Sequence, residues 1–138
     1  MAEFDTLIAA YYRAFNERRV ADAAAMFADD AQVQHRSNVP LRGPEGYLES
    51  VRAATASFPD LHLEVAGIRR HGDTIVEVDL VAIGTHLGDW TGDAGTVKAT
   101  GTKKVIHVRE TLELRAGKFT FSSLNYNLQD LFGSAGAP

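Results

Sequence analysis

TGTKKVIHVRETLELRAGKF, residues 100–119, contains the longest strand-like pattern in the chain. Apolar and polar side chains alternate from about Lys103 to Arg115, and Ala116-Gly117 is a turn that closes the strand. The sequence therefore predicts a long strand with one buried face and one polar face. The buried face comprises Ile106, Val108, Glu110, Leu112 and Leu114.

A carboxylic acid lies in the middle of this apolar face. Burying the side chain of Glu110 is costly unless it is paired, hydrogen-bonded or kept protonated. Groups held in this way are frequent in active sites, so Glu110 is our first candidate catalytic residue. A structural salt bridge, or a position near a solvated strand end, would produce the same pattern.

Length and composition are those of one ordinary globular domain, which we expect to cover residues 1–138. Hydrophobic residues make up 45% of the chain and charged residues 23%. A net charge of −4 without a basic run argues against a nucleic-acid partner. The absence of cysteine excludes disulfides and cysteine nucleophiles. We find neither a secretory leader nor an apolar run of membrane-spanning length, so we expect a cytoplasmic protein without a membrane partner.

The first half of the chain has helical periodicity. Apolar residues recur at helical spacing from about Ala2 to Glu17, and a short second helix follows over Val20–Phe27, with a polar break at Asp29-Asp30. Residues 31–36 predict a brief strand, and residues 37–43 a loop. Pro44 is well placed as the first residue of a third helix, which residues 59–60 end.

The second half alternates with a period of two. The expected segments are a strand from Leu61, a turn at Gly72-Asp73, a strand continuing to His86, a loop or ragged hairpin over residues 87–99, and a last strand from Lys118 to about Asn127. A short tail ends the chain. Helices followed by strands predict an α+β domain: three N-terminal helices packed on a curved, antiparallel or mixed sheet. Three helices cannot fill a large curved sheet, so we expect a pocket between the layers.

Two histidines share the apolar faces with Glu110. Strand parity places His35 and His86 there, whereas His62 and His107 fall on polar faces. An imidazole and a carboxyl group in one dry pocket can act as an acid–base pair, although a structural core histidine explains each position alone. No histidine spacing typical of a metal site occurs, so we expect no metal.

Aromatic and amide side chains complete the candidate site. Tyr12, on the inner face of the first helix, can donate a hydrogen bond to a developing oxyanion, or it is simply a core tyrosine. The expected substrate-binding residues are His86, Trp90, Phe58, Asn125 and Asn127. Packing or turn chemistry is the alternative reading for each of them.

Seven short motifs follow one another along nearly the whole chain: Ala14-Phe15-Asn16, residues 26–31, 41–47, 58–61 and 84–90, Thr100-Gly101 and Gly117-Lys118. The ordered set resembles the SnoaL-like polyketide cyclase family, within the nuclear-transport-factor-two-like superfamily that also includes ketosteroid isomerases and limonene-epoxide hydrolases. This resemblance implies a single SnoaL-like domain with a cone-shaped pocket closed by helices, a homodimer and no cofactor.

The resemblance also assigns residues. The cyclases' histidine on the penultimate strand and aspartate on the last strand correspond to Glu110 and Leu124. Compared with the ketosteroid isomerases, the oxyanion tyrosine, the base and the protonated acid correspond to Tyr12, His35 and Glu110. An aspartate of many SnoaL-like chains corresponds to Asn127. The isomerase-like set is chemically workable, with histidine in place of aspartate as the base.

The resulting hypothesis is a cofactor-independent acid–base enzyme of isomerase, cyclase or lyase type. Its substrate is a small hydrophobic molecule, namely a polyketide- or steroid-like carbonyl compound. His35 moves the proton, while a neutral Glu110 and Tyr12 donate hydrogen bonds to the enolate oxygen. Two alternatives stay open: an epoxide-hydrolase-like enzyme that uses an ionised acid, and a non-catalytic binding or dimerisation module on the same fold.

Overall fold

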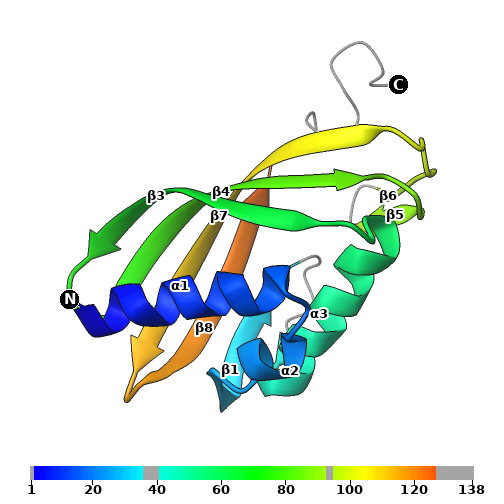
Figure 1. The fold of residues 1–138 in the computed structure, drawn as a ribbon. Helices are drawn as coiled ribbons and strands as arrows, with labels where there is room; N and C mark the ends of the chain where they lie inside the picture. The colour runs from blue at the N-terminus through cyan, green and yellow to red at the C-terminus, as the bar shows by residue number, and fades with distance from the viewer. Residues whose placement is uncertain (1, 36–40, 93–94, 127–138) are drawn as a thin grey trace.

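A computed structural model describes residues 2–35, 41–92 and 95–126 of the chain, and it confirms the predicted α+β class (Figure 1). Helices precede most of the strands, as the change in periodicity predicts. The elements are α1 (Ala2–Asn16), α2 (Val20–Ala24), β1 (Phe27–Gln34), β2 (Leu41–Arg42), α3 (Gly43–Ser57), β3 (His62–His71), β4 (Ile75–Thr85), β5 (Trp90–Gly92), β6 (Gly95–Val97), β7 (Lys103–Arg115) and β8 (Lys118–Tyr126).

The large sheet is mixed and strongly curved. Its strand order is β2-β1-β8-β7-β4-β3, in which β1 and β8 run parallel and the other neighbours are antiparallel. Figure 1 shows α1 lying across the hollow side of the sheet, with α2 and α3 beside β1. The sheet order brings β1, β7 and β8 together although they are distant in sequence.

The strand β7 has the predicted bounds and the predicted faces. Ile106, Glu110 and Leu112 are buried, and the Glu110 residue is only 2% exposed. The strand ends in a turn in which Ala116 and Gly117 both have positive φ, a conformation that is common for glycine and rare for alanine. The alternation therefore predicts which side chains this strand buries.

Apolar side chains from α1 fill the space above the sheet. Phe4, Ile8 and Phe15 lie at helical spacing, are at most 5% exposed and belong to one cluster with Val78 of β4 and Phe119 of β8. Packing of this apolar face, more than helix propensity, holds the helix in place. Among the helices of the described residues, none is long and apolar enough to cross a membrane.

Two boundaries differ from the sequence-based expectation. Phe27 begins strand β1 instead of ending a helix, and Asp29-Asp30 lies within that strand instead of forming a break. The flanking residues pair with β8, Phe27 with Phe119 and Gln32 with Phe121, and the register shifts between them, so the acidic segment lies in an irregular part of the strand. The expected loop over residues 37–43 contains β2, which pairs with β1. Within the expected loop or hairpin over residues 87–99, the short strands β5 and β6 pair antiparallel.

A β-bulge changes the faces of β8. Glu113 pairs with Phe121 and Leu114 pairs with Phe119, so Thr120 is the extra residue that the register places opposite no residue of β7. Phe119 and Ser122 are therefore both buried although they differ in parity. The bulge directs alternate side chains of the second half of β8, namely Ser122, Leu124 and Tyr126, toward the hollow of the sheet.

Candidate active site

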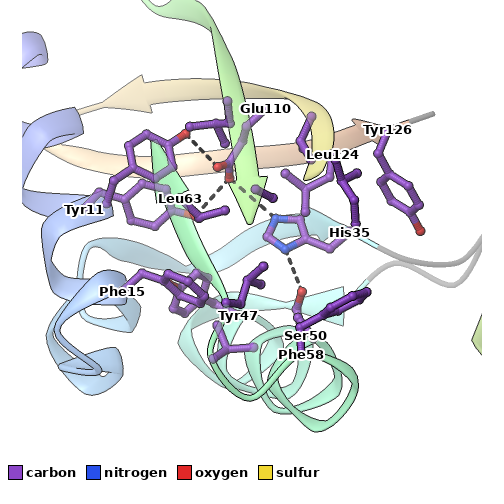
Figure 2. A pocket seen from close by; sticks show the side chains of 18 of the residues that line it. Tyr11, Phe15, His35, Tyr47, Ser50, Phe58, Leu63, Glu110, Leu124 and Tyr126 are labelled. Carbon is purple, nitrogen blue, oxygen red and sulfur yellow. Dashed lines mark hydrogen bonds and ion pairs between the residues drawn. The ribbon is translucent and has the colours of Figure 1, made fainter. Parts of the chain in front are cut away.

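An apolar cavity of about 140 Å³ lies between the helices and the hollow face of the sheet. Side chains from α1, α3 and five strands line it, and most of them are apolar or aromatic. Three of its lining residues, His35, Ser50 and Glu110, form a polar end (Figure 2). The sequence-based expectation of a pocket between the two layers agrees with this cavity.

Glu110 lies at the centre of this polar end and accepts three hydrogen bonds. Its Oε1 accepts one from the Tyr12 hydroxyl group at 2.8 Å. Its Oε2 accepts one from the Tyr11 hydroxyl group at 2.9 Å and one from Ser122 Oγ at 2.5 Å. Two neighbouring tyrosines of α1 therefore contact one carboxyl group of β7, each on a different oxygen (Figure 2 shows the Tyr11 contact).

His35, in the bend that follows β1, lies between two serines. Its Nε2 is 2.6 Å from Ser122 Oγ, and its Nδ1 is 2.7 Å from Ser50 Oγ. The distance between His35 Nε2 and Glu110 Oε2 is 3.6 Å. The four residues form one continuous chain of contacts: Glu110, Ser122, His35 and Ser50.

Hydrogen-bonding capacity fixes the direction of this chain. Ser122 has a single proton, which it donates to Glu110, so its oxygen must accept the Nε2 proton of His35. In neutral imidazole only one nitrogen carries a proton, and Nδ1 then accepts the proton of Ser50. The neutral site therefore has a basic nitrogen directed at the Ser50 hydroxyl group.

The surroundings of Glu110 favour its ionised form. Burial alone would raise the pKa of this carboxyl group, but the interaction with His35, together with hydrogen bonds from Ser122 and Tyr12, holds the pKa below its usual value. These contacts favour an ionised Glu110 over the neutral, hydrogen-bond-donating Glu110 expected from the sequence. An apolar strand face indicates burial but does not reveal the hydroxyl groups that two other segments, α1 and β8, direct at the carboxylate.

The tyrosines divide into two kinds. Burial and the charge of Glu110 raise the pKa values of Tyr11 and Tyr12, whose protons are used in bonds to that carboxylate. Tyr12 therefore has no proton for a substrate oxyanion, contrary to expectation. Tyr47 of α3 also lines the cavity with a pKa raised by burial, and its hydroxyl group has no hydrogen-bond partner among the described residues. Tyr47 is the available phenol donor.

The other expected residues are only partly brought together. Phe58 and Trp90 line the cavity as expected. His86 does not line it: the ring stacks behind Phe58, with 5.2 Å between centroids, and burial lowers its pKa. Asn125 is exposed beside Arg109 because the bulge in β8 turns Leu124 and Tyr126 inward instead. Asn127 lies outside the described residues.

Four site residues were absent from the sequence-based set: Tyr11, Tyr47, Ser50 and Ser122. Ser50 carries a recognisable signal, since it is a polar member of the helical row Tyr47, Val51 and Ala54 that otherwise faces the cavity. Ser122 carries none, because the bulge that turns it inward becomes visible only in the strand pairing. No group of three His, Asp or Glu side chains within residues 2–35, 41–92 and 95–126 is arranged to hold a metal ion.

Comparisons with known proteins give a consistent picture. A family model described as a SnoaL-like domain matches residues 8–121, while curated protein sequences give no match. IdmH from Streptomyces antibioticus, a proposed polyketide cyclase, is 25% identical, with a TM-score of 0.77 over 96% of this chain and 98% of its own. AclR from Streptomyces galilaeus, a proposed hydroxylase, is 23% identical, with a TM-score of 0.80 over 100% of this chain and 99% of its own.

A third similar structure is TsrD from Streptomyces laurentii. It is 20% identical, with a TM-score of 0.81 over 100% of this chain and 98% of its own. At these identities AclR and TsrD show the shared fold alone. The whole described architecture, including the layer of helices over the cavity, therefore recurs in proteins of distant sequence.

Proposed function

The chain belongs to the SnoaL-like domain family, a family of small-molecule-binding α+β proteins, and on that premise we propose that it is a cofactor-independent acid–base enzyme. The proposed substrate is a hydrophobic carbonyl compound with a polyketide- or steroid-like ring that enters the apolar cavity. The proposed reaction is isomerisation, cyclisation or a lyase step. All three begin with removal of a proton next to a carbonyl group.

One observation carries this proposal: the unbroken chain from Glu110 through Ser122 and His35 to Ser50, at the end of an apolar cavity. His35 is the proton acceptor, and Ser50 lies between its Nδ1 and the cavity and passes the proton on. The ionised Glu110 holds the imidazole through Ser122 and stabilises the imidazolium that forms.

The enolate that forms in this step needs a hydrogen-bond donor. We assign that role to Tyr47, because its hydroxyl group is protonated and unpartnered among the described residues. Glu110 and Tyr12 take supporting roles in place of the donor roles expected from the sequence. In a water-poor cavity a single well-placed donor stabilises a developing negative charge strongly.

Deuterium exchange tests this function without knowledge of the natural substrate. 2-Indanone, a small ketone with acidic α-hydrogens, is incubated with the protein in D₂O, and loss of the α-hydrogen signal is followed by proton NMR. We expect catalysed exchange by the native protein and a decrease on the order of 100-fold in His35→Ala, since general-base catalysis typically contributes that much.

His62→Ala is the matched control, because the side chain of His62 is 52% exposed and lies outside the cavity. We expect this variant to exchange at the native rate. Equal rates for the native protein and His35→Ala would contradict the proposal and favour a non-catalytic binding module. An epoxide-opening role is less well supported, because both oxygens of Glu110 already accept hydrogen bonds from protein hydroxyl groups.

A homodimer, a cytoplasmic location and a single domain over residues 1–138 are further parts of the proposal. The homodimer rests on the resemblance to the family. Light scattering coupled to size-exclusion chromatography, over a range of protein concentrations, distinguishes a dimer from a monomer.

A further inference from the structure

Beyond proton transfer, we propose that Ser50 is a nucleophile and that the same cavity hydrolyses small aromatic or aliphatic esters through an acyl-serine. Ser50 Oγ lies 2.7 Å from His35 Nδ1, within the distance at which a base activates a hydroxyl group. His35 is oriented in turn by Ser122 and, through it, by Glu110. A nucleophile, a base and a group that orients the base are the three parts of a catalytic triad.

The environment of Ser50 separates it from an ordinary helical serine. Hydroxyl groups inside helices usually bond to the carbonyl group four residues earlier, as Thr55 Oγ1 does to the Val51 oxygen at 2.8 Å. The described partner of Ser50 Oγ is instead the imidazole ring. Ser50 is also 5% exposed and lines the cavity, so its small accessible surface faces the place where a ligand would bind.

A tetrahedral intermediate also needs a donor for its oxyanion. Tyr47 lies three residues before Ser50, on the same face of α3, and both line the cavity (Figure 2). Its phenol stays protonated because burial raises its pKa, and it has no partner among the described residues. Two hydroxyl groups on adjacent turns of one helix therefore have complementary roles. Ser50 attacks the acyl carbon, and Tyr47 stabilises the oxyanion.

The reaction balances with water as the only co-reactant. The Ser50 proton moves to His35 Nδ1 while Oγ bonds to the acyl carbon, and the carbon–oxygen bond to the alcohol breaks as the alcohol takes that proton. Water then attacks the acyl carbon and gives a proton to Nδ1. The bond between Ser50 Oγ and the acyl carbon breaks, Oγ takes that proton back from Nδ1, and the carboxylic acid leaves. A cavity of about 140 Å³ suits one ring, since an engineered apolar cavity of about 150 Å³ holds benzene.

Covalent labelling tests this inference. The native protein is treated with phenylmethanesulfonyl fluoride, whose single ring suits the cavity, and the product is measured by intact mass and peptide mapping. We expect one phenylmethanesulfonyl group, attached at Ser50, with loss of fluoride. Labelling is absent in Ser50→Ala and slower by on the order of 100-fold in His35→Ala, because the base no longer removes the serine proton.

Thr55→Ala is the matched control, since Thr55 lies in the same helix but its hydroxyl group donates to the Val51 carbonyl oxygen and does not line the cavity. We expect native labelling in this variant, and circular dichroism verifies that each variant is folded. Hydrolysis of phenyl acetate, followed through release of phenol, should fall in parallel with labelling. Labelling elsewhere, or a folded native protein that neither reacts with the sulfonyl fluoride nor hydrolyses phenyl acetate, overturns the inference.

The two activities fail separately. Labelling at Ser50 without exchange of 2-indanone overturns the proton-transfer function and leaves the nucleophile. Exchange of 2-indanone without labelling overturns the nucleophile and leaves the proton-transfer function.

Discussion

At the scale of single residues, His35 and three hydroxyl groups favour the ionised form of Glu110. Tyr11, Tyr12 and Ser122 all donate to its carboxyl group, and none can accept a proton from it while doing so. A carboxylate that accepts several hydrogen bonds is stabilised in its ionised form even when it is fully buried. The side chain is therefore a fixed negative charge that orients and stabilises the imidazole of His35.

Glu110→Gln separates this role from that of a neutral donor. Because glutamine is uncharged and has a donating amide group, it cannot accept all three hydroxyl protons or stabilise an imidazolium. We expect 2-indanone exchange to fall by on the order of 100-fold and the free energy of unfolding by about 1–3 kcal/mol, the usual consequence of an unsatisfied buried hydrogen bond. Proton NMR and urea unfolding measure the two effects. If Glu110→Gln exchanged 2-indanone at the native rate, the result would support a neutral Glu110 that donates a hydrogen bond.

Sequence patterns locate some of these residues and miss others for a physical reason. Alternation on β7 predicts the burial of Glu110, and the pattern around His35 predicts that it faces the interior. Neither pattern predicts protonation, which depends on hydroxyl groups that α1 and β8 bring from distant parts of the chain. Ser122 is the extreme case, because a bulge rather than a residue type turns it inward.

At the scale of elements, the segment after β4 is held against the end of α3 by close backbone contact. The Leu87 and Gly88 nitrogens both donate to the Ser57 carbonyl oxygen, at 3.0 and 3.1 Å, and Ser57 Oγ donates to the Asp89 carbonyl oxygen. A Cβ atom on Gly88 would lie 2.0 Å from the Ala56 oxygen. This contact fixes the start of β5, where Trp90 forms a wall of the cavity.

Gly88→Ala should therefore destabilise the protein. The added methyl group cannot avoid a backbone oxygen, so the segment must move, and overpacking of this kind costs about 1–3 kcal/mol. Urea unfolding measures the loss, and Trp90 fluorescence reports the displaced wall. Gly67→Ala is the control, because its Cβ would meet only Asp79 Oδ2 at 3.6 Å, an ordinary contact. Equal stability of the two variants would contradict the close approach of Gly88 to the Ala56 carbonyl oxygen.

The sequence predicts the bounds and buried faces of elements that have a strong local pattern. It does not predict those of elements that depend on pairing with a distant strand. The alternation of β7 gives both of its ends, and the row of Val76, Val78 and Leu80 gives the buried face of β4. Asp29 and Asp30 resemble a break because acidic residues disfavour strands. They are nevertheless part of β1, in the irregular stretch between Phe27 and Gln32, the two positions at which this strand pairs with β8 on either side of them.

At the scale of the whole molecule, the order of the strands assembles the site. Positions 35, 110 and 122 are far apart in sequence, and they meet because β1, β8 and β7 are neighbours in the sheet. The succession of helices and strands predicts the α+β layers, but it does not predict that β1 pairs in parallel with β8. The composition of the site depends on that parallel pairing.

A buried histidine makes the stability of the molecule sensitive to acid. Burial lowers the pKa of His86 in the folded state, so the unfolded chain binds a proton first as the pH falls below about 6.5. Stability is fully present above that pH and decreases as the pH falls toward the folded-state pKa. We expect His86→Gln to be less stable near neutral pH but to lose less stability between about pH 7 and pH 5.

Urea unfolding at several pH values measures the free energy of unfolding of the native protein and of His86→Gln as a function of pH. Glu110 adds a separate loss only in stronger acid, because its pKa is lowered, and its contribution disappears as the pH falls through that pKa. His107→Gln is the control, since His107 lies on the exposed face of β7. Parallel curves for the native protein and His86→Gln would show that the acid sensitivity arises elsewhere.

The contact between Ser50 and His35 gives the cavity a reversible polarity. While the imidazole is neutral, the serine proton points at Nδ1 and Ser50 presents only oxygen lone pairs, so Tyr47 is the donor for a ketone oxygen. Once the imidazole has accepted a proton, Nδ1 donates instead, and the serine proton turns toward the ligand, which suits the enolate oxygen formed in the proposed reaction. Uptake of one proton by His35 and rotation of the hydroxyl proton of Ser50 thus convert an acceptor at this end of the cavity into a donor.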